Sequence, residues 1–374
     1  MGMRVGILGG GQLARMMALE AHRLGIEPHI FSSSAQDPAA QVSKFWTHGN
    51  LQDFKALDVF IESMDYVTFE SEFAPTASLE RWQNSWEKKT PEKIFPRPSV
   101  MKRLQNRASQ KQTLIDFKIP TSPYLEISKS SELETVIQQL GPRFVLKTTF
   151  GGYDGYGTFF AKTPADIAKL SDQMNNSTQS FIAEKFVSFQ REIAVILVRT
   201  HSGKCFSLPL VETKQTDGRC DWVIGPISHK AYAGLEKKLF RMLNELEYVG
   251  VMGVEMFDTG KEILVNELAP RVHNSGHYSQ EALSQSQFSL HLRAGLDHNL
   301  EIPKLIGKEF VMVNLLGESD KKLQVPEKLS GTLHLYGKSD NRPGRKMGHV
   351  NYVSLKKIPG LLKFALKERK GFQL

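Results

Sequence analysis

The first part of the chain alternates between short apolar runs and segments of helical pattern, and this alternation limits the fold more than any other feature. Residues 3–9 form an apolar run that leads through glycine into a helical segment at 12–17. Further apolar runs occupy 27–31 and 66–69. Strands that alternate with helices are typical of a parallel sheet with helices on its faces. We therefore predict an α/β domain at the N-terminus.

The pattern changes where prolines accumulate, at Pro91, Pro96 and Pro98. Proline interrupts helices and strands, so we expect a domain boundary between 95 and 100. The 374 residues are enough for two or three domains. Beyond the boundary, the expected strands are 144–147, 180–183, 192–198, 206–211, 249–257, 262–268, 310–316, 331–336 and 348–354. The expected helices are 100–118, 234–248 and a basic helix at the C-terminal end.

Composition restricts the class of protein. Hydrophobic residues make up 40% of the chain and charged residues 24%, which is ordinary for a soluble globular protein. Cys205 and Cys220 lack metal-ligand spacing and cannot form a disulfide framework, so we expect free thiols in a reducing compartment. No apolar run approaches the roughly 18 residues of a membrane span, and residues 1–20 do not resemble a signal peptide. We expect a cytoplasmic protein with no membrane partner.

The chain is basic, with 48 Lys and Arg against 40 Asp and Glu and a formal net charge of +8. These cations are spread along the chain and are not interleaved with aromatic residues, as they are in surfaces that bind nucleic acids. A solvated surface with a few phosphate-binding positions explains the charge better. We therefore expect no nucleic-acid partner.

The turn after the first strand, Gly9-Gly10-Gly11-Gln12-Leu13-Ala14, matches the GxGxxA pattern of dinucleotide sites. The second strand, however, ends in Phe31-Ser32-Ser33-Ser34 and offers no acidic residue for a ribose hydroxyl. Two interpretations remain: a turn whose backbone N–H groups bind an anion such as phosphate, and a plain tight turn. A nicotinamide cofactor is disfavoured.

A second glycine-rich segment, residues 151–157, follows the strand at 144–147. Four of its seven residues are glycine, and so much backbone freedom is unusual for a purely structural turn. We interpret the segment as a lid whose N–H groups close over polyphosphate, with Lys147 as a compensating cation. A glycine-rich hairpin is the alternative.

Glu255 and Glu267 lie on two expected strands that are joined at 258–261. A two-residue loop would place the two side chains on opposite faces of the hairpin. A three-residue loop would pair Glu255 with Val265, and the two glutamates would then be diagonal neighbours roughly 7–8 Å apart. Carboxylates at that separation suit Mg²⁺ bound together with substrate phosphates. We predict that both are metal ligands and that Asn266 faces the other way unless the strand twists.

Polar side chains are concentrated directly after that second strand, in the segment 266–277. It carries a carboxylate, an arginine, two histidines, two carboxamides and a serine. We predict a binding or catalytic site here, with a structural loop as the alternative. A second loop, 338–349, holds four cations, which suits a phosphate or a carboxylate; a solvated turn is its alternative.

Taken in order along the chain, these segments resemble a known family. Lys147, the glycine lid, Glu184 and the paired carboxylates resemble the ATP-grasp superfamily. The segments GILGGGQLARM, GGYDGYG, NELAPRVHNSGH and RPGRKMGH are more specifically similar to the N5-carboxyaminoimidazole ribonucleotide synthetases of purine biosynthesis. The resemblance extends over essentially the whole chain.

The resemblance implies a fold that combines α/β and α+β parts in three domains. These are a Rossmann-like domain at 1–98, an ATP-grasp domain of two sheets that sandwich ATP at 99–299, and a small, mostly β domain at 300–374. It also implies ATP and Mg²⁺ as cofactors, with two metal ions. Because dimers are the commonest assembly of a single chain type, we expect a homodimer.

The resemblance further implies a role for each residue at a matching position. The expected ATP contacts are Arg107, Lys147, Gly152, Tyr153, Asp154, Gly155, Tyr156, Gly157, Thr158, Glu184, Lys185, Phe186, Val187, Glu192, Gln215, Asn266 and Glu267. The expected contacts of aminoimidazole ribonucleotide are Gln12, Tyr153, Asp154, Arg271, His273, Asn274, Lys338, Arg345 and Lys346. The expected Mg²⁺ ligands are Glu255 and Glu267.

The implied reaction has two steps. Bicarbonate attacks the γ-phosphoryl group of ATP and gives carboxyphosphate and ADP, while Mg²⁺ and Lys147 offset the developing charge. The carboxyl group then passes to the exocyclic amine of aminoimidazole ribonucleotide, with Asp154 as the expected base and Arg271 as the clamp for bicarbonate. A closed lid would keep water away from the acyl phosphate.

Three positions depart from the pattern of the family. Thr149-Phe150 stands where Arg-Thr is usual, Gln215 stands where a histidine is frequent, and the neighbours of Glu72 differ. The closest alternative is another ATP-grasp ligase, such as a formate-dependent glycinamide ribonucleotide transformylase. An NAD(P) oxidoreductase and a nucleic-acid binder are more distant alternatives.

Overall fold

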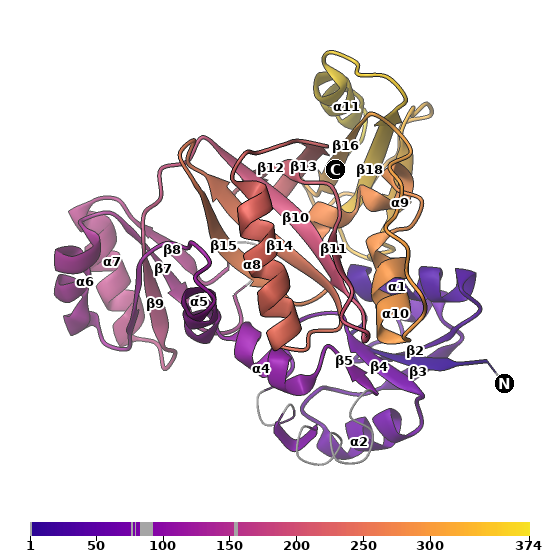
Figure 1. Cartoon of the computed structure of the whole chain (residues 1–374), viewed down its shortest axis with the longest axis horizontal. Coiled ribbons are helices and arrows are strands. Elements are labelled where there is room, and N and C mark those ends of the chain that lie inside the picture. Colours follow the sequence, from indigo (N-terminus) through magenta and orange to yellow (C-terminus); the bar gives the residue numbers. More distant parts are fainter. Residues whose placement is uncertain (1, 76–77, 79, 83–92, 153–155) are drawn as a thin grey trace.

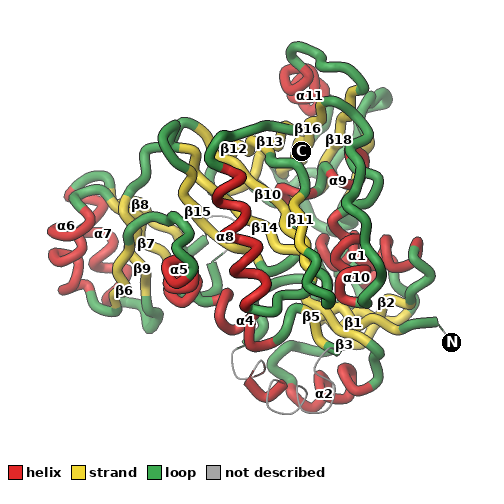
Figure 2. Tube along the Cα trace, in the orientation of Figure 1, coloured by secondary structure: helices red, strands yellow, loops and turns green. Residues whose placement is uncertain are grey.

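The computed structural model of the chain describes residues 2–75, 78, 80–82, 93–152 and 156–374 (Figures 1 and 2). Within these residues the strands form three sheets, of five, four and nine strands. In the same part of the chain, no helix combines the length and the apolar character that a membrane span requires.

The N-terminal sheet is parallel throughout, as the alternation of apolar runs and helices predicts. Its elements are β1 (Arg4–Leu8), α1 (Gln12–Arg23), β2 (Glu27–Ser32), the 3-10 turn η1 (Ala40–Val42), β3 (Phe45–His48), α2 (Phe54–Glu62), β4 (Tyr66–Phe69) and β5 (Ile94–Phe95). The strand order β3-β2-β1-β4-β5 places β1 at the centre and brings the ends of β1 and β4 to the same edge. Residues that follow these two strands therefore lie close together.

A small antiparallel sheet follows and stands at the left in Figure 1. Its strands are β6 (Tyr124–Ile127), β7 (Phe144–Thr148), β8 (Thr158–Ala161) and β9 (Phe181–Lys185), in the order β6-β9-β7-β8. The helices α6 (Leu133–Leu140), which follows the turn η2 (Ser130–Glu132), and α7 (Pro164–Asn175) bury Val136 and Leu170 in a core shared with Phe144. The opposite face of this sheet is left for the candidate site.

The large sheet is antiparallel and contains most of the remaining chain. Its strands are β10 (Arg191–Arg199), β11 (Cys205–Ser207), β12 (Val211–Thr216), β13 (Arg219–Gly225), β14 (Gly250–Asp258), β15 (Ile263–Ala269), β16 (Glu309–Leu316), β17 (Thr332–Leu335) and β18 (Lys346–Ser354). They follow the order β15-β14-β10-β12-β13-β16-β18-β17, and β11 pairs with β10. The helices that accompany it are α8 (Tyr232–Glu245), α9 (Ser279–Ala282), α10 (Gln287–Gly295) and α11 (Leu361–Arg369), with the turn η3 (Asn274–Gly276).

Both faces of the central strands are covered, which explains their continuous apolar sequences. In β10, Ile193, Val195 and Leu197 pack on the side of α8. Ala194 and Ile196, which alternate with them, pack on the side of α1 and α10. The same period of two in β14 places Val254 toward α8 and turns its neighbour Glu255 toward the other face.

The C-terminal strands extend the large sheet, because β16 pairs with β13 and then with β18. Strands from before and after the predicted boundary at 299/300 thus belong to the same sheet. The bounds predicted for the three domains, 1–98, 99–299 and 300–374, stay predictions.

Two expected elements were wrong in their extent. The helix expected at 100–118 is two helices, α4 (Pro98–Gln105) and α5 (Arg107–Asp116). They meet at Asn106, whose backbone is extended and whose side chain accepts the N–H of Ser109 as the cap of α5. The strand expected at 206–211 is divided between β11 and the start of β12, because Pro209 between them has no N–H to donate to a ladder.

The N-terminal sheet is attached to the large sheet through α10. His291 of α10 is fully buried, and its Nδ1 accepts the backbone N–H of Val251 at the start of β14. Because Nδ1 is an acceptor, the proton of the neutral ring lies on Nε2, which is 2.7 Å from the hydroxyl of Thr68 in β4. Burial lowers the pKa of His291 to about 3, so the ring stays neutral.

We predict that His291→Leu destabilises the protein by about 2–4 kcal/mol, because it leaves two buried polar partners unpaired. Thermal and denaturant unfolding measure the change. His298→Leu, at an exposed position just after α10, is the control and should have little effect. A variant of His291 as stable as the wild type would show that this bridge does not hold the two sheets together.

Candidate active site

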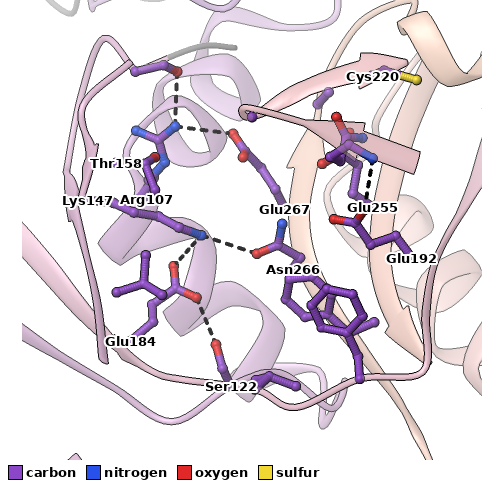
Figure 3. A pocket seen from close by; sticks show the side chains of 18 of the residues that line it. Arg107, Ser122, Lys147, Thr158, Glu184, Glu192, Cys220, Glu255, Asn266 and Glu267 are labelled. Atoms are coloured by element: carbon purple, nitrogen blue, oxygen red, sulfur yellow. Dashed lines mark hydrogen bonds and ion pairs between the residues drawn. The ribbon is translucent and has the colours of Figure 1, made fainter. Parts of the chain in front are cut away.

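A cavity of about 680 Å³ lies between the four-stranded and the nine-stranded sheets (Figure 3). Lys147 and Glu184 face it from the small sheet, and Glu255 and Glu267 face it from the large one. Most residues that the sequence predicted for the site line this cavity: Arg107, Lys147, Gly152, Thr158, Glu184, Lys185, Phe186, Val187, Glu192, Gln215, Glu255, Asn266, Glu267, Arg271, His273, Asn274 and Lys346.

Three carboxylates lie on one face of three neighbouring strands. Glu255 of β14 is directly opposite Glu267 of β15, and Glu192 belongs to the adjacent strand β10. Burial, together with the charges of Glu267 and Glu192, raises the pKa of Glu255 to about 7. Burial also raises the pKa of Glu192, whose carboxylate accepts the backbone N–H of Gln215 at 3.0 Å. A cation would relieve this repulsion.

The hairpin that carries these carboxylates differs from both registers expected from the sequence. Asp258 pairs with Ile263, so the loop has four residues, and Met256 pairs with Val265. A bulge follows, because Glu255 pairs with Glu267 and Asn266 is the extra residue. The glutamates are therefore directly opposite rather than diagonal neighbours.

The bulge also corrects the expected direction of Asn266. Its side chain faces the cavity rather than the opposite face, and its Oδ1 accepts a hydrogen bond from Nζ of Lys147 at 3.1 Å. Lys147 is 2.9 Å from Oε1 of Glu184 on its own sheet. This lysine thus connects the two sheets across the cavity.

Arg107 joins the beginning of α5 to the glycine-rich segment. Its guanidinium donates to the carbonyls of Thr148 and Gly152, each at 2.9 Å, and lies 3.6 Å from Glu267. A Cβ at position 152 would lie 2.5 Å from the guanidinium, so the close approach requires glycine. The predicted residues Tyr153, Asp154 and Gly155 lie outside the described residues.

Arg271 forms a bidentate ion pair with Glu72, which follows β4 of the N-terminal sheet. Burial raises the pKa of Glu72, but the charge and hydrogen bonds of Arg271 outweigh it, so that the net shift is downward. The predicted clamp for bicarbonate is therefore held by a residue from another sheet. The carboxylate fixes the plane of the guanidinium in the cavity.

His273 lies beside the glutamates, with Nε2 at 3.5 Å from Oε1 of Glu255. Its Nδ1 accepts the backbone N–H of Ser275, so the proton of the neutral ring lies on Nε2, toward the carboxylate. Burial, together with the charges of Arg271 and Lys346, holds the pKa of His273 well below its usual value. The ring is neutral at physiological pH.

Asn274 is buried at the same end of the cavity and exchanges two hydrogen bonds with Asn314 of β16. Of the cations predicted in the loop 338–349, only Lys346 lines the cavity. Arg345 is paired with Asp340, and Nζ of Lys338 lies 5.8 Å from the centre of the Tyr336 ring. The predicted contacts of Lys338 and Arg345 with the substrate stay predictions.

The glycine turn after β1 binds an anion, but the anion belongs to the chain. The backbone N–H of Gly11 donates to Oε2 of Glu70 at 2.6 Å, and a Cβ at Gly11 would clash with the same carboxylate. Burial nevertheless raises the pKa of Glu70. Gln12, Tyr156 and Gly157 are described, but they do not line the cavity.

Comparisons with known proteins agree with this arrangement. Three family models match the chain: a ribonucleotide synthetase preATP-grasp domain at 2–105, an ATP-grasp domain at 112–288, and a phosphoribosylaminoimidazole carboxylase C-terminal domain at 311–357. The N5-carboxyaminoimidazole ribonucleotide synthase of Synechococcus elongatus is 34% identical over 358 residues, which cover 92% of this chain and 88% of the relative. The chain belongs to the N5-carboxyaminoimidazole ribonucleotide synthase family.

Solved structures of this synthase family have the same fold. The enzyme of Aspergillus clavatus in complex with ADP and 5-aminoimidazole ribonucleotide aligns with a TM-score of 0.86 and 29% identity, over 99% of both chains. The enzyme of Staphylococcus aureus complexed with ADP aligns with a TM-score of 0.88 and 27% identity, over 98% of this chain and 97% of the other. The predicted fold class and family are confirmed.

The donor set of this family member fits Mg²⁺ held jointly with substrate phosphates. Within the described residues, no group of three or more His, Cys, Asp or Glu side chains could hold a metal alone. Glu255 and Glu267, however, offer opposed carboxylate oxygens, and burial together with the neighbouring carboxylates raises the pKa of Glu255. Two carboxylates plus phosphates are a usual Mg²⁺ environment.

Several residues of the site had not been predicted for this synthase. Glu72 stands in Glu70-Ser71-Glu72-Phe73 after a predicted strand, and its place at the end of that strand was a usable signal. The rings of Phe189 and Phe257 stack 4.7 Å apart in the cavity. Phe257 gave no signal because aromatic residues of strands are usually core, and Phe189 lies between β9 and β10 outside any motif. Ser122 and Cys220 are cavity residues for which no motif existed.

We predict that Glu255→Gln becomes more stable than the wild type as pH rises. A raised pKa means that the contribution of Glu255 to stability is full at low pH and is lost as pH increases through about 7. Melting temperatures at about pH 5.5 and 8.5, without metal or nucleotide, measure the difference. Glu262→Gln, on the exposed turn of the same hairpin, is the control. A constant difference between Glu255→Gln and wild type would contradict the raised pKa.

We also predict that Glu72→Gln lowers turnover by about 10-fold to 100-fold while nucleotide binding is unchanged, because Arg271 loses its orienting carboxylate. Steady-state kinetics and titration with MgADP separate the two effects. Glu62→Gln, exposed on α2, is the control. Equal losses of turnover and MgADP affinity would mean that the ion pair supports the whole cavity rather than Arg271.

Proposed function

We propose that the chain carboxylates 5-aminoimidazole ribonucleotide with ATP and bicarbonate, and forms N5-carboxyaminoimidazole ribonucleotide through carboxyphosphate. Membership of the synthase family supports the activity, and the structures of relatives with ADP and with 5-aminoimidazole ribonucleotide support the two small-molecule substrates. The observation that carries the proposal is that β15 leads from Glu267 directly to Arg271 and His273 in one cavity.

The nucleotide half of the cavity is where we place phosphoryl transfer. Glu255 and Glu267 would hold Mg²⁺, which when bound supplies positive charge to the β- and γ-phosphates of ATP. Lys147 and Arg107 would contact the phosphates from the opposite side, since both line the cavity across from the glutamates. A bicarbonate oxygen attacks the γ-phosphorus, and ADP leaves with the electrons of the broken bond.

The acceptor half is where we place carboxylation. The guanidinium of Arg271, fixed by Glu72, would bind the planar bicarbonate and carboxyphosphate in turn. The exocyclic amine of the substrate attacks the carboxyl carbon, inorganic phosphate leaves, and the amine loses a proton. Asp154 remains our proposed base for that proton. Neutral His273 and the carboxamide of Asn274 would orient the substrate.

The adenine ring of ATP is expected near the apolar end of the cavity. Phe186, Phe189 and Phe257 line that part, with Lys185 and Val187 at the end of β9. Glu192 would bind the ribose hydroxyls, because its carboxylate faces the cavity beside Gln215. We further propose that the site binds two Mg²⁺ ions, that the chain forms a homodimer and that the protein is cytoplasmic.

The proposal predicts that ADP release requires aminoimidazole ribonucleotide and bicarbonate together. A coupled assay with each substrate omitted in turn measures this requirement. ADP release with glycinamide ribonucleotide and formate instead would identify another ATP-grasp ligase and overturn the assignment.

In the same assay, Glu267→Gln should lower ADP formation by about 100-fold or more, because a carboxamide cannot replace a charged metal ligand. The size of the side chain is kept, so the fold should survive. Glu262→Gln, five residues earlier on the same hairpin and exposed, should be fully active. Normal turnover by Glu267→Gln would refute the metal assignment.

A further inference from the structure

Lys111 is a buried lysine with no part in the mechanism above. It lies on α5, one helical turn after Arg107, and its side chain is only 3% exposed. Unlike Arg107, it does not line the cavity. A lysine is almost never buried unless it is paired, so its position requires a specific reason.

The ammonium group of Lys111 uses all of its hydrogen-bonding capacity. Its Nζ lies 2.7 Å from Oγ1 of Thr121, 2.8 Å from Oγ of Ser122 and 2.9 Å from Oε2 of Glu184. An ammonium has three donors, and three acceptors surround it. The group is therefore held in one place.

Glu184 is shared between two lysines. Its Oε2 accepts from Lys111 and from the hydroxyl of Ser122, and its Oε1 is 2.9 Å from Nζ of Lys147. Burial alone would raise the pKa of Glu184, but the two lysines reverse the shift and hold it far below its usual value. Burial lowers the pKa of Lys111, whereas the charge and hydrogen bond of Glu184 act in the opposite direction. Lys111, Glu184 and Lys147 thus form one hydrogen-bonded group, which we call the Lys–Glu–Lys triad.

The charge of the triad depends on Lys111. Glu184 and Lys147 alone would form a neutral pair, and the carboxylate would cancel much of the field of Lys147 in the cavity. With Lys111 present, two positive charges face one negative charge, and the triad is left with a net positive charge. In a partly buried site such a charge acts on a phosphate over several ångströms, because the effective dielectric constant is well below that of water.

We propose that Lys111 is a positioning residue for nucleotide binding and phosphoryl transfer. It anchors Glu184 and offsets the charge of that carboxylate, so that the positive charge of Lys147 acts on the phosphates. The inference rests on the proposed function in taking those phosphates to be those of ATP. Lys111 does not line the cavity, so it acts only through Glu184 and Lys147. If Lys111 only filled space in the core, nucleotide binding would not depend on its charge.

Charge-compensating variants separate the two roles. Lys111→Met makes the triad neutral, and we expect MgADP to bind on the order of tenfold more weakly by calorimetric titration of the full chain. Adding Glu184→Gln to Lys111→Met restores the net positive charge. The double variant should therefore recover much of the lost affinity, although it carries a second change in the same buried cluster.

The kinetic readout follows the same logic. In the ADP-release assay, Lys111→Met should raise KM for ATP and lower kcat, with KM for aminoimidazole ribonucleotide unchanged. Lys111→Arg keeps the charge and should stay within about threefold of the wild type. Lys169→Met removes an exposed lysine of α7 that does not line the cavity, and it should behave as the wild type.

Two results would overturn the inference: MgADP affinity of a folded Lys111→Met within about twofold of the wild type, or a double variant that binds more weakly than Lys111→Met. If Lys111→Met melts before the titration, Lys111→Gln, which keeps a donor toward Ser122, replaces it in the same comparison. Titration with MgADP does not depend on the carboxylation reaction. A wild type that binds MgADP but fails the ADP-release assay would therefore refute the proposed function and still test Lys111.

Discussion

Repulsion among three partly buried carboxylates is the constraint around which the cavity is organised. Glu192, Glu255 and Glu267 face the same side of neighbouring strands, and burial together with the charges of the other two raises the pKa of Glu255 to about 7. Such an arrangement persists only where the rest of the fold supports it or a cation relieves it. Opposite these carboxylates the small sheet presents Lys147, and α5 presents Arg107. The positions of the two sheets relative to one another place these charges around a single cavity.

Each end of the cavity depends on a contact between parts of the chain that are distant in sequence. Arg271 receives its carboxylate from Glu72, 199 residues earlier, and Lys147 reaches Asn266 on the facing sheet. Asn274 is held by Asn314, which belongs to the strands that extend the large sheet. These contacts explain why the site needs the N-terminal sheet and the C-terminal strands as well as the two sheets that enclose it.

Much of the fold could be predicted from local pattern. The parallel N-terminal sheet followed from the alternation of apolar runs with helices, and most later strands were placed within a few residues of their observed bounds. The predicted helix at 100–118 was wrong because its composition suits a helix throughout, whereas Asn106 caps a second one. The pairing of β16 with β13 could not be predicted, because strand order depends on contacts between distant segments.

The sequence by itself determined which residues of the site belong together, since a polar segment directly after an apolar strand and a glycine-rich loop after a lysine are both local patterns. Only the tertiary structure decided how those residues face one another. A one-residue bulge brought Asn266 into the cavity and set Glu255 opposite Glu267, and no rule of loop length predicts such a bulge. The tertiary structure also buried two further groups that have no local signal. Lys111 is paired with Glu184, and Glu70 accepts a hydrogen bond from the glycine turn. The physical reason is that desolvation and strand register depend on neighbours from the whole chain, whereas residue type and spacing are properties of a short segment.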